Sequence, residues 1–405
     1  MESGKALGKK PRPFSHVQSP WLILLIVLLT SMAAPLNQFK VPPVMPVLME
    51  AFGQSAGGAG LLMSLFAVTG LFLAIPVGFI LQSLGYRLSA LIATLSLIAG
   101  SGIGALSRSM EIMLASRFIE GAGMSFMSVV APAIIAMRFG AEKRGKAMGI
   151  WAVWVPLGSM IMFIVAPSLA ARWGWRGLWW FGFSYALIMG LFFYLFIKPD
   201  PGSISHRTEP PPSRGLRELG GVLRNRDLWL ISLVFCCFNF VYVAFITWAP
   251  TFLNQIRHAS LTRSSLLVSV TSLLTIMACP TAGWISDRIG SRKVICVIPL
   301  ILMGFLFPLI SSAGEDIFLV LAAAIGFIGG FVPPGVFSAG VEAVGEERLG
   351  GMAMAVIQIG QNSGMLLGPL IFGWAMQSWG WQAAFWILAP VSMLGAVSGW
   401  IARMK

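Results

Sequence analysis

The chain has 405 residues, of which 57% are hydrophobic and 11% are charged, and its mean hydropathy is +0.82. Soluble domains usually carry roughly 25% charged residues, so this composition excludes an ordinary soluble protein and predicts a membrane protein. The formal net charge of +13 could suggest a nucleic-acid partner. The positions of the basic residues give a different explanation.

Twelve apolar segments are separated by charged or turn-forming residues. A transmembrane helix needs about 20 mainly apolar residues to cross the hydrocarbon. We therefore expect an all-α protein with twelve transmembrane helices. The segments are 21–48, 58–82, 88–107, 110–137, 146–170, 176–198, 228–254, 262–286, 294–313, 316–340, 351–377 and 382–402.

The lysines and arginines are unevenly distributed between the two sides of these spans. With the N-terminus placed inside, the inner segments hold 21 of them and the outer loops hold five, while Lys40 and Arg117 lie within spans. Cytoplasmic loops of membrane proteins carry such an excess. We therefore expect both termini in the cytoplasm and the protein in the plasma membrane. The orientation of the chain in the membrane then explains the net positive charge, and we expect no nucleic-acid partner.

The chain repeats itself at a nearly constant offset. "GFILQSLGYR" at 78–87 returns as "GWISDRIGSR" at 283–292, an offset of 205, and "WGWR" at 173–176 returns as "WGWQ" at 379–382, an offset of 206. This repeat predicts two six-helix bundles, residues 1–198 and 228–405. The proline-rich segment 199–227 is the expected cytoplasmic linker. Each half has an even number of spans, so the halves share one orientation, related by an axis along the membrane normal.

The segment "GWISDRIGSRK", Gly283–Lys293, resembles the signature of the major facilitator superfamily between spans 8 and 9. "RFIEGAG", 117–123, is similar to a second element of that family in span 4. The resemblance implies a latch between the halves on the cytoplasmic side, formed by Asp287, Arg288, Arg292 and Lys293. The first-half copy has Gln82 in place of the acid, which predicts a weaker latch there.

Three ionisable residues lie inside predicted spans: Lys40, Arg117 and Glu120. Burying such a group is costly, so each is a functional hypothesis. Arg117 and Glu120 are three residues apart on one helix face and can form a local ion pair. Such a pair is either a self-neutralised structural feature or part of proton or substrate coupling.

Lys40 has no acidic residue three or four positions away, and Asn37 lies on the same face of its helix. Pro42 and Pro43 lack backbone N–H groups, so the carbonyls near residues 38 and 39 lose their donors. Irregular backbone at membrane depth is tolerated where it lines protein or a wet cavity. Two interpretations follow: Lys40 faces a central cavity, or it snorkels to the outer headgroups.

The second half offers neutral polar side chains for such a cavity. Asn239 and Tyr242 are one turn apart on span 7, and the offset of 205 places Tyr242 opposite position 37. Span 11 carries amides at i, i+3 and i+4 spacing, which share one face: Gln358, Gln361 and Asn362. One cation with several amides suits a small anion. The amides could equally bridge neighbouring helices.

We interpret the chain as a secondary transporter, not an enzyme, that moves a small anion by alternating access, with proton coupling or exchange. The sequence has no Walker-type loop or metal-ligand cluster, so no cofactor is expected. Among relatives it looks nearest to the cyanate- and nitrate-type anion porters, and we expect a monomer. Two alternatives are a proton-coupled exporter of hydrophobic or cationic compounds, which commonly has an acid in span 1, and a non-transporting membrane sensor.

Overall fold

The structure is a computed structural model that describes residues 19–74, 76–197, 220–345 and 349–404, without the side chains of residues 82, 141, 283 and 287. Regular secondary structure in these residues is helical. The first half contains α1 (Pro20–Ser31), α2 (Ala33–Phe39), the 3-10 helix η1 (Pro42–Val44), α3 (Met45–Phe52), α4 (Ala56–Leu73), α5 (Pro76–Leu106), α6 (Met110–Arg138), α7 (Ala141–Ala152) and α8 (Trp154–Phe196).

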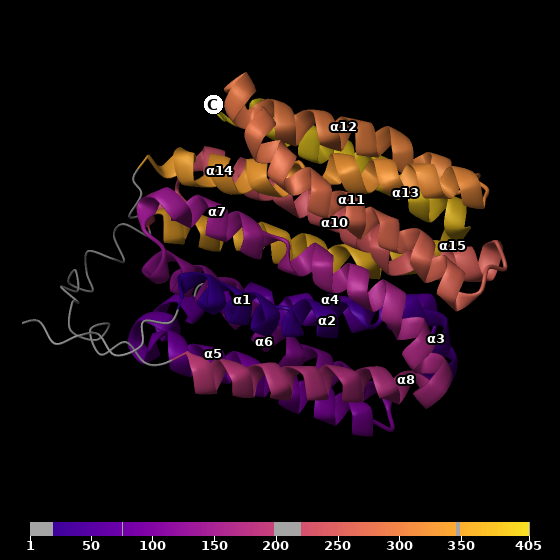
Figure 1. The fold of residues 1–405 in the computed structure, drawn as a ribbon. Coiled ribbons are helices and arrows are strands. Elements are labelled where there is room, and N and C mark those ends of the chain that lie inside the picture. The colour runs from indigo at the N-terminus through magenta and orange to yellow at the C-terminus, as the bar shows by residue number, and fades with distance from the viewer. Residues whose placement is uncertain (1–18, 75, 198–219, 346–348, 405) are drawn as a thin grey trace, which may run out of the picture.

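The second half contains α10 (Arg226–Ile256), α11 (Leu261–Ile289), α12 (Arg292–Ile310), α13 (Glu315–Gly329), α14 (Val332–Val344) and α15 (Gly350–Ile401). Two helix bundles lie one above the other in Figure 1, the first half below and the second half above. Most of the predicted linker, residues 199–219, lies outside the described residues. The exact domain boundaries therefore stay a prediction.

Among the described residues, ten helical segments are long and apolar enough to cross a membrane. Two of them, Glu142–Phe196 and Gly350–Ile401, contain a non-helical glycine at which the chain reverses, Gly174 (φ 66°) and Gly380 (φ 85°). Counting each as two spans gives the predicted twelve. The two glycines are 206 residues apart, in the repeated Trp-Gly-Trp sequence. Both halves thus have a glycine with a positive φ, a conformation that other residues rarely adopt, at the same position of the repeat.

Two expected spans differ from the structure in their details. The predicted second span, 58–82, corresponds to α4, which ends at Leu73, and to the first part of α5, which begins at Pro76 and is divided from the rest of α5 by the non-helical Gly85 (φ 76°). The first span is also broken, as the prolines predict, into α1, α2, η1 and α3. This break positions the candidate site.

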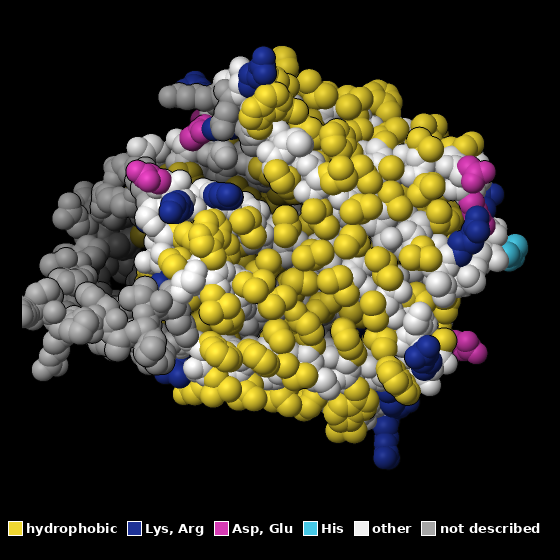
Figure 2. Space-filling model, in the orientation of Figure 1, with side chains coloured by type: hydrophobic (Ala, Val, Ile, Leu, Met, Phe, Trp, Pro, Cys, Tyr) yellow, Lys and Arg dark blue, Asp and Glu magenta, His cyan; other side chains and the backbone are white. Residues whose placement is uncertain are grey.

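Hydrophobic side chains cover the broad middle of the surface in Figure 2, while charged side chains lie towards the two ends of the bundles. The exposed residues include many large apolar ones, such as Phe72, Leu195 and Trp400, which are 68%, 62% and 70% exposed. Lipid tails, in contrast to water, accommodate such a surface at no cost. The band therefore fits the predicted membrane setting.

The two halves meet closely along α4 and α15. The Ser64 hydroxyl donates to the Leu366 carbonyl at 2.6 Å, and a Cβ added to Gly60 would lie 2.8 Å from the Pro369 carbonyl oxygen. Small residues permit this approach between membrane helices. The repeat-related pair of helices, α8 and α11, also meets, with the hydroxyls of Ser159 and Ser272 2.9 Å apart. We call the α4–α15 contact the outer seam.

The outer seam involves the part of α4 nearest the turn that follows α3. Gly78 of α5 and Gly351 of α15 lie further towards the opposite end of the bundles. A Cβ atom added to either glycine would meet nothing within 4 Å. The turn after α3 and helix α7 lie at opposite ends of the bundles in Figure 1. The predicted orientation places the turn after α3 on the outer side of the membrane and α7 on the inner side. The halves are therefore packed tightly towards the predicted outer side.

Gly60→Ala tests the outer seam. The added methyl group would press on backbone atoms of residues 369 and 370, which cannot rotate away. Overpacking typically costs about 1–3 kcal/mol, so the thermal unfolding temperature in detergent should fall. Gly78→Ala, with free space, is the matched control. Equal unfolding temperatures for both variants would show that the seam is not closely packed.

Candidate functional site

Lys40 lies at the break in the first span. Helix α2 ends at Phe39, Lys40 follows it, and η1 begins at Pro42. The helix cannot continue because Pro42 and Pro43 donate no backbone hydrogen bonds. The Lys40 side chain is fully buried.

Each proton of the Lys40 ammonium has an acceptor. Lys40 Nζ donates to Glu120 Oε1 at 2.6 Å and to Asn37 Oδ1 at 2.8 Å, with a longer bond to Ser101 Oγ at 3.4 Å. The same nitrogen lies 4.5 Å from the ring centroid of Trp179, which attracts a cation through its π face. These partners come from α2, α5, α6 and α8, all in the first half.

Arg117 of α6 satisfies the backbone that the proline break exposes. Its guanidinium donates to the Gln38 carbonyl at 3.1 Å and the Asn37 carbonyl at 2.7 Å. In an unbroken helix the N–H of residue 42 would bond to residue 38, but Pro42 has none. Arg117 Nε also donates to the Leu62 carbonyl of α4 at 2.8 Å. Arg117 thus ties three helices together at the break.

Glu120 joins the two basic residues. Its carboxylate forms an ion pair with Lys40 through one oxygen and with Arg117 through the other, and also accepts from Ser101 Oγ at 2.8 Å. All three ionisable side chains are 0% exposed. We call Lys40, Arg117 and Glu120 the buried triad. With both bases protonated and the acid ionised, its net charge is +1.

The structure changes the expected place of Lys40. The sequence shows no acid on its own helix, yet Glu120, 80 residues away, pairs with it. In the conformation described, the Lys40 side chain is 0% exposed and enclosed by first-half residues, and its place beside a substrate stays a prediction. The Arg117–Glu120 pair is present as the spacing suggests, but it is not self-contained, because Glu120 is shared with Lys40.

The proposed second-half partners lie elsewhere. The Asn239 amide donates to the Phe235 carbonyl at 2.8 Å, and the Tyr242 hydroxyl is 2.9 Å from Thr275 Oγ1. The Asn362 amide donates to the Gln358 carbonyl at 2.8 Å and lies against Gly70 of α4, while Gln361 is half-buried. The contacts described for these residues do not include Lys40. That they share one site with its ammonium stays a prediction.

The contacts described for the expected cytoplasmic latch residues are with other residues of the second half. Arg292 Nε donates to Glu342 Oε1 at 3.2 Å, and Lys293 Nζ donates to the Trp400 carbonyl at 2.9 Å. Arg288 stacks over the Trp284 ring at 5.3 Å. The Asp287 side chain lies outside the described residues. A latch between the halves therefore stays a prediction.

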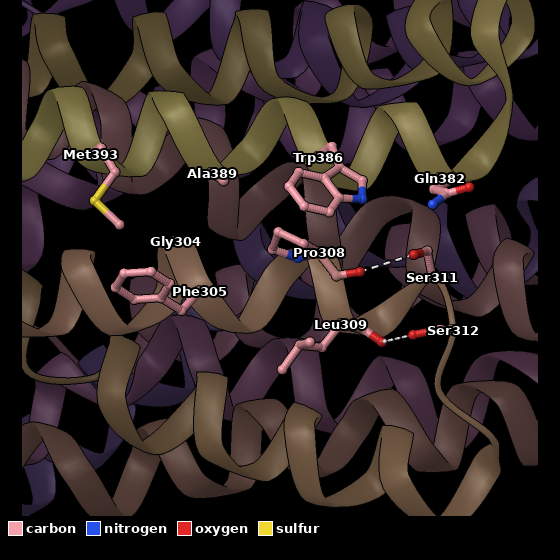
Figure 3. A pocket seen from close by; sticks show the side chains of 10 residues that line it. All are labelled: Gly304, Phe305, Pro308, Leu309, Ser311, Ser312, Gln382, Trp386, Ala389 and Met393. Atoms are coloured by element: carbon pink, nitrogen blue, oxygen red, sulfur yellow. Dashed lines mark hydrogen bonds between the residues drawn. The ribbon is translucent and has the colours of Figure 1, made fainter.

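Two surface hollows lie away from the buried triad. The larger, of about 510 Å³, lies between α12 and the last part of α15 (Figure 3). Phe305, Trp386 and Met393 line it, and at one end Ser311 and Ser312 donate to carbonyls of their own chain segment. The smaller, of about 490 Å³, is lined by Trp173, Arg176 and their neighbours on α8. Neither hollow is lined by a triad residue.

Sequence reasoning missed Ser101, Trp179 and Gln38. Ser101 and Trp179 contact Lys40 from other helices, and serine and tryptophan are too common in membrane helices to stand out. Gln38 is 1% exposed, and both polar atoms of its side chain lack a hydrogen-bond partner among the described residues. An amide inside an apolar span, next to the proline break, was the available signal.

Comparison with known proteins identifies relatives of this chain. Residues 27–352 match the family model of the Major Facilitator Superfamily. The cyanate transport protein of Escherichia coli (strain K12) is 26% identical over 62% of this chain, an alignment that spans 63% of that relative's length. The hexuronate transporter of Bacillus subtilis (strain 168) is 20% identical over 91% of this chain and 90% of the relative.

A solved structure shares the fold. It is a crystal structure of a bacterial homolog to the human lysosomal transporter Spinster, in an inward-facing and occupied conformation. The TM-score is 0.77 at 15% identity, and the match covers 95% of this chain and 97% of the other. The likeness supports the layout of twelve helices in two bundles.

The buried triad predicts an order of stability for two variants. Glu120→Gln leaves two buried cations without an anion, whereas Lys40→Met leaves the Arg117–Glu120 pair intact. Removing one partner of a buried ion pair costs about 3–5 kcal/mol. Glu120→Gln should therefore unfold at a clearly lower temperature than Lys40→Met in detergent, followed by tryptophan fluorescence. The reverse order would contradict the shared carboxylate.

Proposed function

The chain belongs to the major facilitator superfamily, and from this premise we propose that it is a secondary active transporter that moves a small anionic solute by alternating access. The two bundles would rock against each other around a central site and expose it to each side of the membrane in turn. The gradient of a coupled ion would supply the energy.

The observation that carries the anion assignment is the composition of the buried triad, two basic side chains and one acid, whose net charge is +1 when all three are ionised. Charges interact strongly where water is excluded, so an excess positive charge inside the first half attracts an anion and repels a cation. Two of the relatives are named for cyanate and hexuronate, both anions. The same charge disfavours an exporter of cationic compounds.

Glu120 is the group that would couple a proton to the anion. Its carboxylate is the acid of the triad and accepts hydrogen bonds from Lys40, Arg117 and Ser101. A proton on Glu120 raises the net charge of the triad from +1 to +2 and loosens the hold on Lys40. The proton therefore favours the anion, and by linkage the anion favours the proton. This reciprocity supports cotransport of a proton and an anion.

Arg117 has a different role in this proposal. Its contacts with three backbone carbonyls keep the broken first span attached to α6 and α4. A residue bound in this way is a fixed support, while Lys40, bound only through side chains, is free to change partners. The outer seam between α4 and α15 would close the outer side in the conformation described.

The proposal includes the setting of the protein. The protein would lie in the plasma membrane, and the excess of lysine and arginine in the predicted inner segments supports cytoplasmic termini. It would act as a monomer, since each chain of this fold contains both bundles needed for alternating access. It would have no nucleic-acid partner, because its basic residues are explained by the orientation of the chain in the membrane.

Transport into proteoliposomes tests the function. With an acidic exterior, the parent protein should accumulate a small anion from a panel that includes cyanate, acetate and glucuronate. Glu120→Gln should lose accumulation driven by the pH gradient by at least tenfold but keep exchange of labelled for unlabelled anion. Glu111→Gln, on the exposed first turn of α6, is the matched control.

Two outcomes would contradict this function. In the first, the parent takes up no anion of the panel under any gradient but moves hydrophobic cations. In the second, Glu120→Gln accumulates the anion as well as the parent does, which would place proton coupling elsewhere.

A further inference from the structure

The two surface hollows occupy matching places in the repeat. Gln382 and Trp386 line the larger hollow, and subtracting the offset of 206 gives Arg176 and Trp180, which line the smaller one. Each pair lies one helical turn apart and follows the glycine at which the chain reverses in its half. A local packing defect would have no such counterpart. The hollows are therefore a feature of the shared fold.

The smaller hollow combines a cation with exposed tryptophan rings. Arg176 and Gly177 line it together with Trp173 and Trp180. A Cβ added to Gly177 would lie 2.7 Å from the Trp173 Cβ, so the glycine lets the Trp173 side chain lie close to the helix. Tryptophan is enriched at the level of the lipid headgroups, and arginine matches the geometry of a phosphate. The lining therefore suits the phosphate and glycerol region of a phospholipid.

The Arg176 guanidinium is held in place by the first half. Its Nη2 donates to the Ser107 carbonyl, in the turn after α5, at 3.0 Å, and its Cζ lies 4.3 Å from the Trp175 ring centroid. An arginine side chain has five N–H donors, and the bond to Ser107 uses one of them. The others can bond to an acceptor outside the protein. Because the side chain is already ordered, it loses little freedom when it binds one.

Basic residues are concentrated around the smaller hollow. Three of the five arginines in the predicted outer loops lie in the two turns that meet there: Arg108, Arg172 and Arg176. The bond from Arg176 to Ser107 joins these turns, and Arg108 follows Ser107 directly. The rule that orients membrane proteins favours few basic residues on the outer side, so it does not explain this group. An anionic ligand would explain it.

We propose that the smaller hollow binds an anionic phospholipid, with the lipid phosphate on Arg176 and the glycerol region against Trp173 and Trp180. The acyl chains would lie along the face of α8 that continues from Trp180 through Leu187 and Leu191, both of which are exposed. This site lies away from the buried triad and goes beyond the proposed transport function.

The larger hollow provides a comparison within the same chain. Phe305 and Leu309 make most of it apolar, and Gln382 lies at its polar end (Figure 3). The Gln382 amide can donate to a phosphate oxygen but carries no charge. We therefore expect the larger hollow to accept phospholipids without a preference for an anionic headgroup.

Substitutions that exchange the two matching residues test the site. Purified full-length protein in detergent is titrated with phosphatidylglycerol or with phosphatidylethanolamine of the same acyl chains, and bound lipids are counted by native mass spectrometry. The parent should bind one phosphatidylglycerol about tenfold more tightly than phosphatidylethanolamine, because charge-assisted hydrogen bonds are the stronger ones. Arg176→Gln should lose this preference. Gln382→Arg should gain a second tightly bound phosphatidylglycerol.

Arg172→Gln is the matched control. Arg172 is an exposed arginine one turn of chain before Arg176, and it does not line the hollow. Its variant should keep the preference of the parent. Thermal stabilisation gives a second readout, because a ligand that binds only the folded state raises the unfolding temperature. Phosphatidylglycerol should raise the unfolding temperature of Arg172→Gln more than that of Arg176→Gln.

Three outcomes would overturn this site. Arg176→Gln could bind phosphatidylglycerol as tightly as the parent does, or Gln382→Arg could gain no second tightly bound lipid. In the third, glycerol phosphate competes as well as the intact lipid, which would make the hollow a site for a soluble phosphate. The transport function is tested separately, by anion uptake.

Discussion

The structure depends on how the broken first span satisfies its backbone inside the membrane. Pro42 cannot donate to the Gln38 carbonyl, and no water is available at this depth to replace the bond. Arg117 supplies the donor, but a buried guanidinium needs an anion, and Glu120 provides it. The second oxygen of Glu120 then accommodates Lys40. One missing N–H thus accounts for a network that joins α2, α4, α5 and α6.

The two halves share a backbone but differ in this network. The repeat offset relates Lys40 to Phe245, which packs against Phe307 and Phe318. It relates Glu120 to Ile325, which is fully buried among apolar residues. The interior of the second half is therefore apolar where the first half is charged. This asymmetry favours different roles for the two halves. The first half would supply the charge, and the second half would supply neutral hydrogen-bond donors and the surface that moves against the first half.

Much of the fold could be predicted from the sequence. Hydropathy identified the twelve spans, and the repeat identified the two halves, because span length and apolar composition are fixed by the bilayer. The break at the prolines and the Arg117–Glu120 pair followed from local chemistry. The Lys40–Glu120 pair did not, because it joins residues 80 positions apart whose contact depends on helix packing. For the same reason, local spacing could not show that Tyr242 contacts Thr275 of α11 or that Asn362 lies against Gly70 of α4.

The central claim is that anion binding and protonation of Glu120 occur together. Infrared difference spectroscopy of the purified protein, with and without a transported anion, tests it directly. The account predicts that the anion induces a carbonyl band of a protonated carboxylic acid, and that this band is absent in Glu120→Gln. If the anion binds without such a band, or if the band persists in Glu120→Gln, the coupling does not lie in the buried triad.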